Sequence, residues 1–199
     1  MTTRAKETAA VGFTIKSGWA AAVLLGGSAS APRVLDSRRV EISDPDDLDS
    51  TQPYHAGFGT ARDSGGELKR LLSLVKTYGR RSVTALLREY LKQAPLRGAG
   101  VIVGSLIDPK TIGNDHIRIH AMEGQLFRIV VIDAAEKSGL KCVICRERDL
   151  YATAANTLKK PEAVIRKTLS EIRRDDDGGW RAEQKNAALS AWMILGSRG

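Results

Sequence analysis

The chain has 199 residues, a formal net charge of +8 and a hydrophobic fraction of 42 %. These values are typical of a globular protein and disfavour a disordered, collagen-like or coiled-coil chain. Only 5 % of the residues are aromatic, which argues against a single-strand nucleic-acid platform built from stacked rings. Two cysteines are too few for a disulfide framework, and no apolar run approaches the roughly 18–20 residues of a membrane span. We therefore expect a single domain over residues 1–199, with no membrane partner.

A short apolar run, residues 19–25, has basic residues before it and small residues after it, as a signal peptide would. Glu7 and Lys16 interrupt that pattern, however, and the apolar core is at the lower limit of about 7–15 residues. We therefore expect a cytoplasmic location.

The N-terminal part predicts an antiparallel meander of three strands, over residues 9–15, 19–25 and 33–42. Ser17 and Gly18 form the turn signal between the first two strands. The third strand has a mixed polar and apolar pattern, which is typical of a strand near the edge of a sheet.

Residues 43–63 predict a long flexible loop, acidic in its first half and glycine-rich in its second half, which contains His55. The segment GFGTAR (57–62) begins like a dinucleotide fingerprint, but Arg62 replaces the third glycine and no strand precedes it. Its backbone amides and Arg62 are a candidate anion cradle, with a plain surface loop as the alternative.

The remaining chain alternates helices and strands. Ser64 and Glu67 have the spacing of a capping box before a helix over 65–93, which we expect to be broken near Gly79. A strand, a helix and a second strand follow, and this unit predicts a parallel pair with a right-handed crossover. The expected ranges after the first helix are strand 100–107, helix 115–138, strand 140–146 and helices 149–159, 161–174 and 180–195.

This order of elements resembles the ribonuclease H-like superfamily, which includes nucleases, Holliday-junction resolvases and related ATPase domains. The segment VGFTIKSGWAAAVLL (11–25) also resembles the first hairpin of that superfamily. The resemblance implies an α/β fold: a mixed sheet, with a three-strand antiparallel meander plus parallel strands, and flanking helices.

One position departs from the pattern of the superfamily. Thr14 stands where its nucleases carry a metal-binding Asp, and Lys16 and Ser17 lie beside it. Two-metal phosphodiester chemistry with Mg²⁺ or Mn²⁺ needs a cluster of carboxylates, so the usual mechanism is in doubt. Other carboxylates follow later strands or lie on the last helix, and surface acids are the alternative interpretation: Asp108, Glu147, Asp149 and Glu183.

His116, His120 and Glu123 form the sharpest cluster in the sequence. Their spacing of i, i+4 and i+7 places them on one side of a helix, and two imidazoles with a carboxylate suit Zn²⁺ or Mn²⁺. Helix capping or surface packing is the alternative. The candidate catalytic residues are Glu123, Asp149 and Glu183.

Cys142 and Cys145 form a C-x-x-C pair inside an apolar strand, where positions i and i+3 point to opposite faces. This geometry predicts inert thiols rather than a redox or zinc site.

The basic residues are spread over several helices and loops, so solvated helix faces compete with a polyanion-binding surface. The candidates for binding nucleic acid or another anion are Lys16, Arg62, Arg80, Arg81, Arg146 and Arg148.

The sequence favours a non-catalytic or divergent module that binds nucleic acid, and it leaves enzymatic activity open. One alternative is a metal-dependent phosphodiester hydrolase that uses His116, His120, Glu123 and Asp149. Another is a scaffold that forms a homodimer through Leu189, Trp192 and Met193.

Overall fold

The fold centres on one five-stranded mixed sheet. The computed structural model describes residues 7–57, 60–62, 64–172 and 179–197. The strands are β1 (Ala9–Lys16), β2 (Trp19–Gly27), β3 (Pro32–Glu41), β4 (Leu96–Val103) and β5 (Cys142–Arg146). They lie in the order β3-β2-β1-β4-β5, with β1–β3 as an antiparallel meander and β4 and β5 parallel to β1. The expected sheet is confirmed, including the edge position of the third strand.

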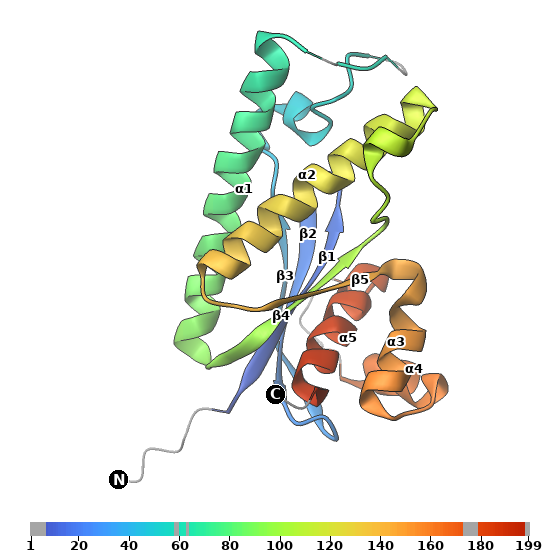
Figure 1. The fold of residues 1–199 in the computed structure, drawn as a ribbon. Helices are drawn as coiled ribbons and strands as arrows, with labels where there is room; N and C mark the ends of the chain where they lie inside the picture. Colours follow the sequence, from blue (N-terminus) through green and yellow to red (C-terminus); the bar gives the residue numbers. More distant parts are fainter. Residues whose placement is uncertain (1–6, 58–59, 63, 173–178, 198–199) are drawn as a thin grey trace.

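Helices cover both faces of the sheet (Figure 1). They are α1 (Gly66–Gln93), α2 (Asp115–Lys137), α3 (Leu150–Leu158), α4 (Glu162–Glu171) and α5 (Ala182–Gly196). Alternate strand residues divide the core, because neighbouring side chains on a strand point to opposite faces. Val11 and Phe13 pack with α1 and α2, whereas Ala10 and Val23 pack with α3, α4 and α5. No helix among the described residues is long and apolar enough to cross a membrane.

Helix α5 lies unusually close to β1 and β4. A Cβ atom on Gly12 would be 1.8 Å from the carbonyl oxygen of Ala187, and one on Gly100 would be 2.6 Å from Cβ of Ser190. Glycine at these two strand positions therefore allows the helix backbone to rest on the sheet.

Helix α1 is continuous, so the expected break at Gly79 is wrong. A Cβ atom on Gly79 would be 2.6 Å from Cγ2 of Ile42 and 2.8 Å from Cγ1 of Val130, so this glycine permits close packing inside an intact helix. The expected capping box is also absent, because Gly65 is the N-cap residue and Glu67 pairs with Arg70.

Several boundaries differ from those expected. Strand β4 begins and ends four residues early, and Leu106 and Ile107 beyond it are exposed. Residues 173 and 174 of the expected fourth helix, and Phe58 and Gly59 of the glycine-rich segment, lie outside the described residues.

The face of α5 expected to form a dimer is not on the surface. Leu189 and Trp192 are fully buried and Met193 is 5 % exposed, all within the core between the sheet and α3 and α4. The apolar residues therefore serve packing within the chain, and this interface prediction is wrong.

The two cysteines lie on opposite faces of β5, as expected. Cys142 contacts the core beneath α1 and α2, and Cys145 belongs to the core on the other side. Burial raises the pKa of both thiols, to about 11 for Cys142.

Candidate functional site

Three imidazole rings meet at the N-terminal end of α2. His116 and His120 lie one turn apart on α2, with ring centroids 4.6 Å apart. His55 comes from the loop before α1, and its ring centroid lies 5.1 Å from that of His120 and 6.4 Å from that of His116. The structure therefore adds to the expected pair a third histidine from a distant part of the chain.

Glu123 lies beneath these rings and is 1 % exposed. Its Oε1 is 2.8 Å from Nδ1 of His55 and its Oε2 is 3.8 Å from Nδ1 of His120. Oε2 has no hydrogen-bond partner. Burial raises the pKa of the Glu123 carboxyl, while burial and then the two neighbouring histidines lower the pKa of His120. Glu123 is thus a buried partner of the histidines, and the metal-ligand role that the sequence suggested for it stays a prediction.

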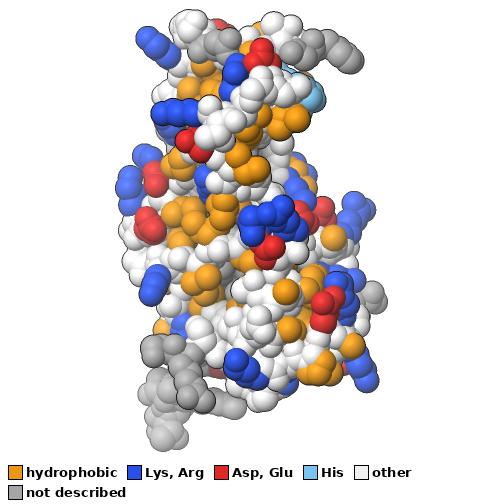
Figure 2. Space-filling view, turned by 45° about the vertical axis from the view of Figure 1, so that its right-hand side comes forward, with side chains coloured by type: hydrophobic (Ala, Val, Ile, Leu, Met, Phe, Trp, Pro, Cys, Tyr) orange, Lys and Arg blue, Asp and Glu red, His pale blue; other side chains and the backbone are white. Residues whose placement is uncertain are grey.

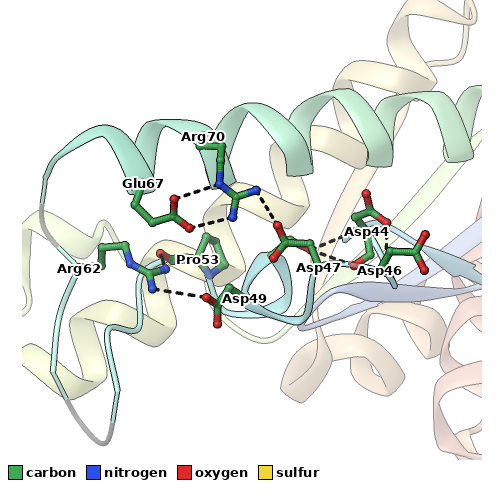
Figure 3. A network of polar contacts seen from close by, with 9 residues as sticks. Asp44, Asp46, Asp47, Asp49, Pro53, Arg62, Glu67 and Arg70 are labelled. Atoms are coloured by element: carbon green, nitrogen blue, oxygen red, sulfur yellow. Dashed lines mark hydrogen bonds and ion pairs between the residues drawn. The ribbon is translucent and has the colours of Figure 1, made fainter.

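Ion pairs fasten the loop that carries His55 (Figure 3). The Arg70 guanidinium on α1 donates to Asp47 at 2.6 Å and to Glu67 at 2.8 and 3.0 Å. Arg62 donates to the carbonyl of Pro53 at 3.0 Å, and the backbone at Arg62 donates to Tyr54 at 2.7 Å. Arg62, expected as part of an anion cradle, is thereby engaged in holding the loop.

A second polar group lies at the carboxyl ends of β1 and β5. Nζ of Lys16 is 3.4 Å from Oε2 of Glu147 and 4.0 Å from Oε1 of Glu183. Asn186 on α5 donates to the other Glu147 oxygen at 3.0 Å. Thr14 is buried two residues before Lys16, and its hydroxyl has no hydrogen-bond partner. An ammonium group therefore lies between the two carboxylates.

A cavity of about 390 Å³ joins the two groups. Lys16 and Glu147 line it at the sheet, and His120 lines it from α2. Its other walls are mainly apolar and include Ile15 and Phe127. A mostly apolar hollow with a few convergent polar groups is the usual form of a ligand site.

The remaining acidic candidates lie outside this arrangement. Asp149 pairs with Arg146, lies 3.8 Å from Arg148 and makes no side-chain cap to α3. Asp108 accepts from the backbone of Lys110 and so caps a short turn. Neither residue lines the cavity that contains His120.

Both basic candidates on α1 have a partner close by. Arg80 lies 3.7 Å from Asp133, and Arg81 lies over the ring of Tyr78. On the face drawn in Figure 2, basic side chains are scattered among acidic and apolar ones. The contacts of Arg80 with Asp133 and of Arg81 with Tyr78 favour the interpretation of both arginines as part of a solvated helix face.

The sequence offered little sign of His55 or of the Lys16 contacts. His55 is isolated in a loop, and Glu147 and Glu183 lie more than 130 positions after Lys16. The available signal was the spacing of His116 and His120, which places two imidazoles on one helix face and leaves a third unspecified.

The whole chain was compared with known proteins. No family model matches it, and the search of curated proteins gave no match. The structure is similar to that of Thermus thermophilus RuvC in complex with a Holliday junction substrate, with a TM-score of 0.55 and 11 % identity over 94 % of this chain and 91 % of that one. A second Thermus thermophilus RuvC structure gives a TM-score of 0.54 and 11 % identity, over 93 % of this chain and 92 % of that one. The fold is therefore the ribonuclease H-like fold that the order of elements predicted.

Proposed function

We propose that this protein is a divergent ribonuclease H-like module that binds nucleic acid without two-metal cleavage at the end of β1. The observation that carries the proposal is the position of the Lys16 ammonium between Glu147 and Glu183. Two-metal hydrolysis requires carboxylates free to hold two cations about 3.5–4 Å apart. Here both oxygens of Glu147 have partners, Lys16 and Asn186, and Thr14 contributes no charge.

Three further observations support a nucleic-acid ligand. The similar RuvC structure is a complex with a Holliday junction, and this chain carries a net charge of +8. Arg146 and Arg148 lie at the end of β5 beside Glu147, and the Arg148 side chain is 72 % exposed. Phosphate contacts by such side chains release counterions and strengthen binding at low salt.

Fluorescence anisotropy with four-way, duplex and single-stranded oligonucleotides across a salt series tests the proposal. We expect binding that persists at physiological salt, and no cleavage with Mg²⁺. Arg148→Ala should reduce the salt slope of the binding constant by about 1, the effect of losing one phosphate contact. Arg166→Ala, which removes another exposed arginine from α4, is the matched control and should leave the slope unchanged. Absence of binding at physiological salt, or cleavage that requires Glu147, would contradict the proposal.

A metal-dependent phosphodiester hydrolase is a second candidate, favoured by one observation. His120 lines the same cavity as Lys16 and Glu147, so a phosphodiester there would lie beside the His120 imidazole. A cleavage assay with Zn²⁺ or Mn²⁺ tests this candidate, which predicts nicking that His120→Ala abolishes. Asp149, included in the set expected from the sequence, does not line this cavity and should be dispensable.

A further inference from the structure

We propose that His55, His116 and His120 bind one zinc-class transition-metal dication. The proposal does not depend on nucleic-acid binding. The chain contains three histidines, and all three meet at this point. One ligand nitrogen from each ring lies within 4.8 Å of the others. Around a tetrahedral ion with Zn–N distances of about 2.0–2.1 Å these nitrogens would be roughly 3.4 Å apart. His116 and His120 are exposed, so their rings are free to rotate toward that spacing.

The buried carboxylate of Glu123 provides a second, independent sign of a cation. Metal-binding histidines usually donate their other ring N–H to a carboxylate, which fixes the ring and makes it a better ligand. Oε1 of Glu123 lies 2.8 Å from Nδ1 of His55, and in the tautomer with hydrogen on Nδ1 the ring donates to this carboxylate and keeps Nε2 for the metal. The second Glu123 oxygen is buried without a hydrogen-bond partner and faces His120. Burying a charged carboxylate oxygen without a hydrogen-bond partner raises the free energy of the folded protein. A dication bound by the adjacent rings would offset this increase by attracting the carboxylate.

The kind of ligand atom in the site determines which metal it prefers. Three imidazoles without a directly coordinating carboxylate suit Zn²⁺ and its neighbours Co²⁺, Ni²⁺ and Cu²⁺, whereas Mg²⁺ and Mn²⁺ prefer oxygen ligands. The Mg²⁺ or Mn²⁺ suggested by the superfamily resemblance would need a cluster of carboxylates, which is a different set of ligands from these three rings. Three protein ligands leave a fourth position for water or for a ligand, and His120 places that position beside the cavity.

Calorimetric titration with Zn²⁺, and absorption spectra with Co²⁺, test the site in the full chain without a tag. The protein is first dialysed against a chelator, and no nucleic acid is present. We expect one Zn²⁺ per chain, a tetrahedral Co²⁺ spectrum, and no displacement by millimolar Mg²⁺. His120→Ala should weaken Zn²⁺ binding at least 100-fold, and Glu123→Gln should weaken it about 10- to 100-fold, the range for loss of such a carboxylate partner.

Two further variants test whether the histidines, and not the cysteines, bind the metal. Cys142→Ser removes the less buried of the two thiols in the chain and should leave the affinity unchanged, because Cys142 packs against the core on the side of the sheet that α1 and α2 cover. His116→Ala changes an exposed residue and gives the same test as His120→Ala if the latter folds poorly. Urea unfolding in chelator confirms that each variant is folded. Zn²⁺ affinity that is unchanged in His116→Ala and His120→Ala, or lost in Cys142→Ser, would overturn the proposal.

Discussion

The contact between Gly12 and α5 makes a single methyl group a severe perturbation. In Gly12→Ala the new Cβ would be 1.8 Å from the carbonyl oxygen of Ala187 and 2.5 Å from Oγ of Ser190, whereas ordinary contacts begin at 3.4 Å. The nearest atom belongs to the helix backbone, so no side-chain rotation relieves the clash. The helix must withdraw from β1, and the fully buried Ala187, Ala188 and Ala191 lose packing.

We expect Gly12→Ala to lower the free energy of unfolding by about 3 kcal/mol, the upper part of the usual range for overpacking. With a urea m-value of about 2 kcal/mol/M, the midpoint should fall by roughly 1.5 M. The fluorescence of the buried Trp192 reports the transition. Gly124→Ala is the matched control, because Gly124 lies within α2 and a Cβ there meets no atom within 4 Å. It should stabilise the protein by about 0.5–1 kcal/mol. A midpoint for Gly12→Ala equal to that of the wild type would refute the reasoning about α5.

Two further predictions concern the loop and α5. Hydrogen bonds from Arg70 lower the pKa values of Asp47 and Glu67 below their ordinary values of 3.8 and 4.5. The free energy with which these contacts stabilise the loop is therefore fully present above the ordinary pKa values. It is lost as the pH falls through the lowered pKa values, where the two carboxylates become protonated. The protection factors for hydrogen exchange over residues 44–56, corrected for the intrinsic pH dependence of exchange, should therefore fall at acidic pH in the wild type and be low already at neutral pH in Arg70→Ala. Equal protection factors in both proteins would refute the tether. Trp192→Ala should cost about 3–5 kcal/mol because the ring is fully buried, without changing the sedimentation coefficient. A wild-type dimer that dissociates in Trp192→Ala would contradict its assignment to the core of the chain.

The sequence predicted the strands well because their signals are local. The meander follows from short apolar runs separated by Gly18 and by the turn before Pro32, and the parallel pair follows from a helix between two strands. The expected break in α1 was wrong for a physical reason. In the sequence, Gly79 resembles the glycine that ends a helix. In the structure, its missing side chain makes room for the side chains of Ile42 and Val130.

The last helix illustrates a different limit. Residues 187–195 are apolar almost all round, and such a helix is covered on every side rather than along one stripe. We expected part of it to be an interface because the sequence does not show that α3 and α4 return to cover it.

The candidate site could be predicted only in part. The pair His116 and His120 could be predicted because helical spacing places both side chains on one side of the helix. The position of His55 beside α2 and the contacts of Lys16 form only when distant parts of the chain fold together. No local sequence pattern predicts the distance between residues so far apart in the chain. Glu123 was found by its spacing, but its burial, and with it its bond to His55, became evident only in the fold.

The order in which the sheet is covered has a consequence for synthesis on the ribosome. Strands β1–β4 and helices α1 and α2 emerge first and can close one face of the sheet, whereas α5 follows every strand. Until α5 has emerged, Ala10, Val23, Leu25 and Ile102 on the other face lack the helix that buries them. Nascent chains stalled before residue 182 would thus present an apolar sheet surface, the kind of surface that chaperones bind and that promotes aggregation.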